Sequence, residues 1–513
     1  MSNTSPLSPA EKAAKAEKLD NAKWLDESLA IDNPAFKSFC EEILEDIYKA
    51  NKTQRKNINK HLPQLKILIL NLIVALEFHG GVIAISKAKE TYSPLTKLSY
   101  RVMVDLLVNS LVSMGYLMQF SGFFGGLVGV RSRFEVLKPF KDKLFQSGIE
   151  EAAIYHTKPD QLVILKDENK RPIKVAVKDL KVKEEINLQV AQINNRIQSS
   201  FIDLILTNEE LGEVRNTLRK RKDEMLSKHN KPRRLDFTNS YIHRSFNNSS
   251  FEQGGRFYGG WWETIPKEFR PYITIDNWFT EELDYSAIHI NLLYNQIGID
   301  TEELFYDPYL LPDLDPRSRD VTKIIMLILL NAATPRKALK AINSKANEED
   351  SKIILPGSMK DFKDYIELIN QYHEPISHFF GKGEGVKLQN KDAQIATAVM
   401  LRMDKQHQAT CLPIHDSFIV ADPHVMYLRE IMHEEYEALS GFECRVDMKS
   451  TTLGKVDTEE RLKLIEAMYE DEEEELWGYR SRYAKWKQKN DWRYETEGGE
   501  PINEKPGRLS RFL

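Results

Sequence analysis

Two apolar stretches, each carrying an aspartate at its end or edge, constrain this chain more than any other feature of its sequence. Residues 281–294, EELDYSAIHINLLY, place Asp284 between a strand pattern and a helical pattern. Residues 411–420, CLPIHDSFIV, have the pattern of a β-hairpin with His415 and Asp416 at its turn. If the two segments form neighbouring strands, their carboxylates share one site. Two such carboxylates suit two hard divalent cations, so we predict a two-metal site at Asp284 and Asp416.

Length and composition set the frame around this site. A chain of 513 residues is long enough for roughly two to four domains. Its net charge of −5 gives no overall basic balance, so a local basic patch is the feature to search for. The three cysteines, Cys40, Cys411 and Cys444, form no CxxC pair, which favours a reducing compartment. The N-terminus has no signal-peptide pattern, and the longest apolar stretch, 65–78, is too short and polar to cross a membrane. We expect a soluble, cytoplasmic protein.

The N-terminal third combines helices with a glycine-rich hairpin. Helical periodicity marks residues 34–50, 62–78 and 97–113. Two apolar strand-like runs joined by a Gly-rich loop follow at 116–137. Helix, helix and hairpin is the order of a winged helix-turn-helix, which commonly docks one helix in the DNA major groove, although protein–protein adaptors and small α+β lobes share it. We expect a winged-helix-like α+β domain at 61–180, after a flexible N-terminus and a helix in 1–60.

A basic segment follows within a long helical pattern from 182 to 228. Its cations are scarcely balanced by acids, which favours contact with phosphates over a solvated helix face. The residues expected to bind nucleic acid are Arg219, Arg221, Lys222, Arg233 and Arg234. The next stretch, 251–280, mixes glycine and aromatic residues with Arg256, a composition that suits either stacking on bases or packing under a sheet.

A helix predicted from 317 to 342 carries two cations on one face. Arg319 and Lys323 are four residues apart on a helix that is otherwise largely apolar. Such a pair suits a polyanion such as a triphosphate, whose leaving pyrophosphate it would neutralise. With two aspartates and two Mg²⁺ ions, or Mn²⁺ in their place, the set describes nucleotidyl transfer more naturally than hydrolysis.

The order of these motifs resembles the palm and fingers of family A (Pol I-like) DNA polymerases, and is similar to that of the phage-type single-subunit RNA polymerases. The resemblance covers about residues 250–450. The matching residues are Gly255-Arg256 and Ile265-Pro266 before motif A, Asp284-Tyr285-Ser286 in motif A, Arg319 and Lys323 in motif B, Gln394 on the helix before motif C, and His415-Asp416 in motif C. Each motif is common by itself, but five of them in this order make a fairly specific signal.

The resemblance implies a right-hand polymerase fold, α+β in class, and a role for each matching residue. Asp284 and Asp416 would hold the two metal ions, with the backbone carbonyl of Tyr285 as a further ligand. Arg319 and Lys323 would grip the triphosphate. Three residues would contact the nucleic acid, namely His415 at the primer terminus and Arg256 and Gln394 at the duplex or template strand.

The same resemblance divides the rest of the chain. The expected parts are a thumb-like basic region at 181–250, palm segments at 251–300 and 356–455, fingers at 301–355, and a charged C-terminal tail at 456–513. The N-terminal third lacks a convincing Asp-x-Glu strand, so a 3′–5′ exonuclease and proofreading are not expected.

Four positions depart from the DNA polymerase pattern and leave the choice of sugar open. His289 stands where a glutamate usually excludes the ribose 2′-hydroxyl, and Leu327 where an aromatic residue usually stands. Asn331-Ala332 replaces Tyr-Gly, and Ser417 follows the motif C aspartate as in the RNA polymerases. The candidate substrate-binding residues are therefore Tyr285, Ser286, His289, Leu327, Asn331, Arg256 and Gln394.

Three functions remain in competition. Template-directed DNA synthesis, with a DNA template and primer and nucleoside triphosphates as partners, comes first because residues 255–286 look most like the DNA polymerases. RNA synthesis or template-independent transfer is favoured by His-Asp-Ser and the altered motif B. The third is a non-catalytic winged-helix DNA-binding replication protein with a decayed palm, against which the retained aspartates and cations argue.

The segment 373–378, HEPISH, is one residue too long for an HExxH zinc site.

Overall fold

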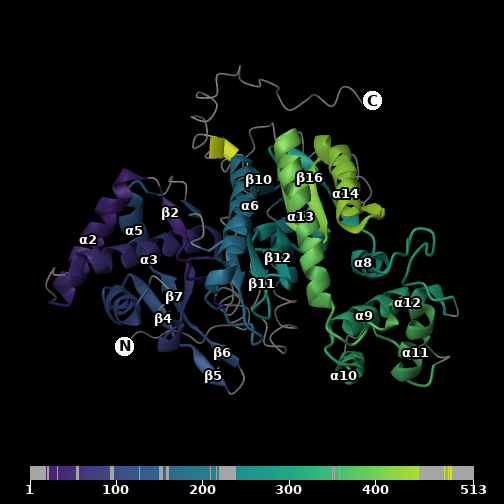
Figure 1. The fold of residues 1–513 in the computed structure, drawn as a ribbon. Coiled ribbons are helices and arrows are strands. Elements are labelled where there is room, and N and C mark those ends of the chain that lie inside the picture. Colours follow the sequence, from purple (N-terminus) through teal and green to yellow (C-terminus); the bar gives the residue numbers. More distant parts are fainter. Residues whose placement is uncertain are drawn as a thin grey trace. The chain divides into compact units, whose positions relative to one another are not determined.

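The protein is an α+β chain of two compact units, seen in a computed structural model (Figure 1). The first unit takes in residues up to 159 with 209–239 and 481–498, and the second takes in 160–208 and 240–480. The structure describes residues 22–449 apart from gaps at 32, 53–56, 93–97, 126–127, 150–153, 157–160, 208, 215, 219–238, 313, 349–350, 352 and 357–358, together with residues 19, 479, 483–484 and 486–487.

The first unit packs helices around a four-stranded sheet. Its helices are α2, Pro34–Ala50; α3, Ile58–Phe78; a π-helical segment, Arg101–Val108, that continues into α4, Asn109–Ser113; and α5, Lys138–Gln146. The sheet runs in the order β1, Lys23–Trp24; β3, Val82–Ile85; β7, Ser132–Val136; and β4, Leu117–Phe120. Two further strand pairs join β2, Leu29–Ile31, to β8, Ile154–His156, and β5, Phe123–Gly125, to β6, Val128–Val130.

The core of this unit explains why its helices form where the periodicity predicts them. The apolar faces of α2 and α3 and the inner face of the sheet make one buried cluster. Asn33 caps α2 by accepting a hydrogen bond from the Ala35 backbone N–H at 2.8 Å, and Pro34 follows at the first helical position. The predicted hairpin is confirmed, because β4 and β7 pair antiparallel from Leu117 with Val136 to Phe120 with Arg133.

The second unit is built on a six-stranded sheet. Its order is β10, Ile202–Leu204; β13, Ile273–Ile275; β14, Trp278–Tyr285; β16, Ser417–Ala421; and β15, Cys411–Ile414, with β17, Val446–Lys449, pairing with β14. A smaller sheet has the order β12, Gly254–Tyr258; β11, His243–Phe246; and β9, Val163–Leu165.

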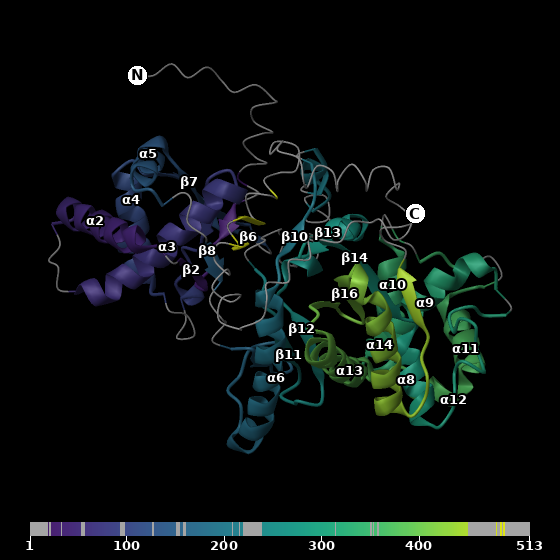
Figure 2. The ribbon, with the colours of Figure 1, turned by 90° about the horizontal axis from the view of Figure 1, so that it is seen from above.

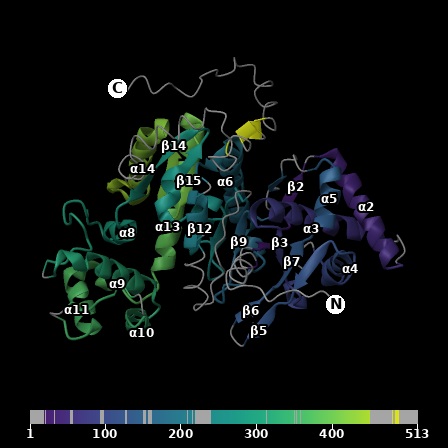
Figure 3. The same cartoon turned by 180° about the vertical axis from the view of Figure 1, so that it is seen from behind.

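Helices surround these sheets, and one of them runs through the middle of the unit. They are α6, Leu180–Ser199; α8, Ile288–Gln296; α9, Arg319–Asn331; α10, Pro335–Ala346; α11, Phe362–Tyr372; α12, Glu374–Ser377; α13, Gly385–His407; and α14, Val425–Ser440. The long helix α13 lies beside α14 and contacts β12 and β15 (Figure 2). The shorter helices α9 to α12 form a group at the N-terminal end of α13 (Figure 3).

Two of the predicted helices are wrong in length. The helix expected from 182 to 228 ends at Ser199, because Ser200 is extended and the β-branched and apolar residues that follow form β10 in the central sheet. The helix expected from 317 to 342 breaks after Asn331. There Thr334 caps a new helix by accepting a hydrogen bond from the Lys337 backbone N–H, and Pro335 begins it.

Several predicted boundaries also differ from the observed units. Helix α2 belongs to the core of the first unit, whereas the segment from 161 to 180 belongs to the second. The group of short helices extends past 355 to include α11 and α12. The expected charged tail at 456–513, apart from five residues, lies outside the described part of the chain.

Candidate active site

The central sheet brings the two predicted aspartates together. β14 pairs antiparallel with β16, and Asp284 lies opposite Ser417 in the register. Asp416 immediately precedes that serine, and its backbone carbonyl accepts a hydrogen bond from the Tyr285 N–H at 3.4 Å. The strand–aspartate–helix and hairpin predictions are both confirmed, since β14 leads into α8 and β15 pairs with β16 across the turn.

The turn itself is built under backbone strain. His415 has a φ of 59°, and it links β15 to β16 together with Asp416. A left-handed conformation costs a non-glycine residue about 1 kcal/mol, and such strain is concentrated at functional sites. The His415 ring lies edge-on to Tyr258 of β12, with their centroids 6.5 Å apart. The hairpin therefore presents His415 and Asp416 next to the smaller sheet.

The electrostatics of Asp284 favour a bound cation. Burial and the nearby Asp416 carboxylate raise the pKa of Asp284 to about 6, although Lys449 acts in the opposite direction. Its Oδ1 is buried and has no hydrogen-bond partner within the described part of the chain. A buried carboxylate oxygen without a donor, beside a second carboxylate, is a suitable ligand for a hard cation. Asp284 and Asp416 thus fit the predicted metal ligands, and Tyr285, whose carbonyl was expected to be a further ligand, directly follows Asp284 in the chain.

A third carboxylate, which the sequence did not reveal, lies beside this pair. Glu282 is two residues before Asp284 on β14 and so on the same face of the sheet. Its Oε1 accepts a hydrogen bond from the Ser417 hydroxyl at 2.6 Å and lies 3.1 Å from Arg270 and 3.2 Å from Lys449. Burial alone would raise the pKa of Glu282, but Lys449 and Arg270 outweigh it and hold that pKa below its usual value.

Among the described residues, no group of three or more His, Cys, Asp or Glu side chains is arranged to hold a metal ion. The candidate metal ligands are the carboxylates of Asp284 and Asp416, since Glu282 is already engaged by Arg270, Lys449 and Ser417. Mg²⁺ is commonly bound by only one or two protein carboxylates, with water and substrate phosphates as its other ligands.

A second buried cluster joins Arg256 and His289 through a carboxylate that was not predicted. Asp392 of α13 lies 2.8 Å from His289 Nε2 and 3.0 Å from Arg256 Nε, and a further Arg256 nitrogen also contacts it. Burial lowers the pKa of Arg256, but Asp392 outweighs burial and raises it overall. His289, at the expected sugar-selecting position, is thus held by Asp392 and faces Arg256.

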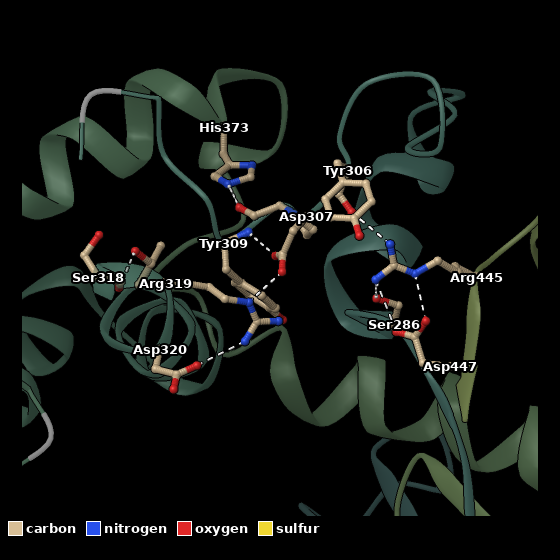
Figure 4. Close-up of polar contacts among 12 residues, drawn as sticks. Ser286, Tyr306, Asp307, Tyr309, Ser318, Arg319, Asp320, His373, Arg445 and Asp447 are labelled. Atoms are coloured by element: carbon tan, nitrogen blue, oxygen red, sulfur yellow. Dashed lines mark hydrogen bonds and ion pairs between the residues drawn. The ribbon is translucent and has the colours of Figure 1, made fainter. Parts of the chain in front are cut away.

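The predicted cation pair lies around a buried tyrosine. Arg319 pairs with Asp307 at 2.6 Å and with Asp320 at 3.0 Å (Figure 4). The Tyr309 ring centroid is 5.6 Å from the Arg319 guanidinium carbon and 5.6 Å from Lys323 Nζ. Burial raises the pKa of Tyr309, and the next largest cause is the carboxylate of Asp416. Tyr309 thus contacts both cations with its ring and is close enough to Asp416 to feel its charge.

A buried histidine fixes the loop that carries Tyr309. His373 Nε2 bonds the Pro308 carbonyl at 2.9 Å (Figure 4). Its Nδ1 bonds the Tyr294 hydroxyl at 2.9 Å. Burial lowers the pKa of His373 to about 4, so the ring is neutral at physiological pH. The first histidine of the HEPISH segment is therefore a packing residue.

The other predicted substrate-binding residues occupy varied positions. The Tyr285 hydroxyl donates to the Met432 carbonyl at 2.6 Å, so this side chain points into the core and away from the carboxylates. Gln394 donates to Asn390 on α13 at 2.7 Å. Leu327 is 38% exposed on α9 and accepts, at its carbonyl, a hydrogen bond of 2.8 Å from Asn331.

A cavity of about 440 Å³ opens beside Ser286. Asn291, Thr301, Tyr306 and Arg445 are among its lining residues. Arg445 donates to the Ser286 hydroxyl at 3.0 Å and to the Tyr306 carbonyl at 3.1 Å, and its guanidinium lies over the Tyr306 ring (Figure 4). Ser286 is therefore a wall of this cavity, two residues after Asp284.

The predicted nucleic-acid-binding residues, Arg219, Arg221, Lys222, Arg233 and Arg234, lie outside the described part of the chain. None of the helices that the structure describes has the length and apolar character needed to cross a membrane. No protein-family model matches the sequence, and no curated protein matches it either.

One of the three carboxylate and lysine residues that were missed, Glu282, carries a signal in the sequence. Strand alternation puts Glu282 on the same face as Asp284, so this residue was within reach of sequence reasoning. Asp392 and Lys449 were not, because their contacts depend on α13 and β17 meeting elements more than a hundred residues earlier.

Proposed function

We propose that this protein is a template-directed nucleotidyltransferase that uses two Mg²⁺ ions, and that it acts as a family A-like DNA polymerase without a proofreading exonuclease. The observation that carries the proposal is the pair formed by Asp284, on β14, and Asp416, in the turn that leads into the neighbouring strand β16, with one oxygen of Asp284 left without a donor in the described part of the chain. Charge repulsion between the two carboxylates is relieved most simply by a cation between them.

Each part of the site has a role in this chemistry. Asp284, Asp416 and the Tyr285 carbonyl would hold the ions, which when bound activate the attacking hydroxyl and stabilise the leaving oxygen. Arg319 and Lys323 would exchange their present neighbours for the triphosphate, and neutralise the charge that develops on pyrophosphate. Tyr309, whose ring lies against both cations, would line the path of the triphosphate.

The proposal also assigns the larger parts of the fold. The central sheet with α8, α13 and α14 would be the palm, the group α9 to α12 the fingers, and α6 part of a thumb. The first unit, with its helices and the β4–β7 hairpin, would be a winged-helix-like module that contacts DNA. Support for these assignments comes from the order of the motifs and from the positions of the strands that carry the aspartates.

A primer-extension assay tests the proposal. Purified protein is given a labelled primer on a template with Mg²⁺ and dNTPs, then with NTPs, and then without template. We expect extension with dNTPs on the template, and a loss of about a thousandfold for Asp416→Asn, since metal-ion catalysis is worth several kcal/mol. Asp422→Asn, an exposed acid at the far end of β16, is the matched control and should extend like the wild type.

The other outcomes separate the competing functions. Extension with NTPs alone would identify an RNA polymerase, and extension without template would identify a terminal transferase. If no nucleotide is incorporated and Asp416→Asn behaves as wild type in DNA binding, the protein is a non-catalytic DNA-binding protein and the proposal is wrong.

A further inference from the structure

Lys449 ends β17 directly over the carboxylate cluster. In the register of β14 and β17, Lys449 lies opposite Glu282, so both side chains project from the same face of the sheet. Its ammonium nitrogen is 2.8 Å from Asp284 Oδ2 and 3.2 Å from Glu282 Oε1. The side chain is 29% exposed, so it can reach solvent without any change in the sheet.

The charges around Lys449 are unevenly shared. Glu282 has three partners, namely Arg270, Ser417 and Lys449, and would keep two of them if the lysine moved. Asp284 depends on Lys449 at Oδ2, while its Oδ1 has no donor in the described part of the chain. Asp416 also acts electrostatically on Lys449. The ammonium group therefore supplies the positive charge that Asp284 needs beside Asp416.

We propose that Lys449 is a tethered cation that occupies Asp284 in the metal-free protein and is displaced from it when a divalent ion binds. This inference rests on the proposed function, because it takes Asp284 to be a metal ligand. Glu282 has two other partners, Arg270 and Ser417, so displacement of Lys449 leaves Glu282 paired. Metal binding at this site is then an exchange of one cation for another, and Lys449 sets the metal affinity as a positioning residue.

The exchange has a physical basis in both directions. Without metal, Lys449 offsets the repulsion between Asp284 and Asp416. With metal, a divalent ion between the two carboxylates gains more Coulomb energy than a single ammonium group at one of them. A lysine is suited to the exchange because its charge lies at the end of a flexible stem.

Direct metal binding tests the inference without any activity assay. Mn²⁺ is titrated into the full chain, and the free ion is followed by its electron paramagnetic resonance signal. The titration is run at pH 8.5, where Asp284 is ionised in every variant that retains it. Lys449→Met should bind Mn²⁺ about tenfold more tightly than wild type, because a fixed positive charge next to the ion is gone. Lys449→Arg keeps that charge and should bind like wild type.

The variants also separate this inference from the proposed function. Asp284→Asn should lose Mn²⁺ binding at the site; if it binds as wild type does, the metal does not lie at Asp284 and the proposed function loses its ground. If Asp284→Asn loses binding but Lys449→Met binds no more tightly than wild type, the inference alone is overturned.

A measurement on the wild type covers the case in which Lys449→Met fails to fold. Lysine amines are acylated with an N-hydroxysuccinimide ester, and the rate at Lys449 is read by mass spectrometry. Saturating Mg²⁺ should raise the rate at Lys449 several-fold, because the amine leaves Asp284, while exposed Lys405 on α13 serves as the internal reference. An equal rate with and without Mg²⁺ would overturn the exchange.

Discussion

Two aspartates of the second unit, the buried Asp392 and the partly buried Asp284, lie in opposite electrostatic situations. Asp392 is held by both Arg256 and His289, so its carboxylate meets two donors. Asp284 meets Lys449 at one oxygen and has a second carboxylate, Asp416, as its neighbour. A buried carboxylate whose partners come from the chain holds structure together, whereas one that lacks them is prepared for a ligand. The contrast separates the structural cluster of Asp392, Arg256 and His289 from the candidate metal site.

The largest expected effect is on activity at the under-paired aspartate. Asp284→Asn removes the proposed metal ligand but keeps the shape of the side chain. Primer extension should fall about a thousandfold, because a ligand that acts in the transition state is worth several kcal/mol. Far-ultraviolet circular dichroism should be unchanged. A variant that retains more than a tenth of the wild-type rate would show that Asp284 is not part of the catalytic site.

The next effect is on stability at the fully paired aspartate. Asp392→Asn leaves Arg256 and His289 without their carboxylate, and breaking a buried ion pair from one side costs about 3 kcal/mol. Urea unfolding followed by tryptophan fluorescence measures the loss. Glu367→Gln, at an exposed position on α11, is the control and should change the free energy of unfolding by less than about 0.5 kcal/mol. A similar small change for Asp392→Asn would mean that its contacts contribute little.

Unlike Asp392→Asn, the substitution Asp284→Asn should raise the free energy of unfolding. The pKa of Asp284 is raised from 3.8 to about 6 in the metal-free fold, so ionised Asp284 opposes folding above pH 6. Asp284→Asn should therefore be more stable than wild type by about 2 kcal/mol at pH 8 in EDTA. The difference should shrink as the pH falls from 6 to 4, because the folded wild type then binds its proton. A destabilised variant at pH 8 would contradict the raised pKa.

Local patterns predicted the elements that carry the aspartates but not what surrounds them. The alternation and apolar runs around Asp284 and Asp416 were long enough to define a strand, a helix and a hairpin, and these formed as expected. The helix expected to 228 failed because FIDLIL fits a helical period and a buried strand equally well, and pairing of Ile202 with Ile275 decided between them.

The sequence could not predict the residues that contact the site, Asp392 and Lys449, because these contacts also depend on tertiary packing. Asp392 and Lys449 reach their partners only because α13 packs on β12 and β17 pairs with β14. No spacing in the sequence predicts either contact. The motif around His289 predicted a sugar-selecting role for this residue, but its spacing gave no indication that the distant Asp392 would hold the imidazole.

The smallest expected effect concerns that imidazole. His289 Nε2 lies 2.8 Å from Asp392 and faces Arg256, so its ring is committed to the paired cluster. His289→Gln should change the ratio of dNTP to NTP incorporation by less than about threefold, which corresponds to about 0.6 kcal/mol. Competitive extension with both nucleotides on one template measures this ratio, and His433→Gln on α14 is the control. A change above tenfold would mean that His289 leaves Asp392 in the nucleotide complex and contacts the ribose. His289 would then be a substrate-binding residue and not a structural partner of Asp392.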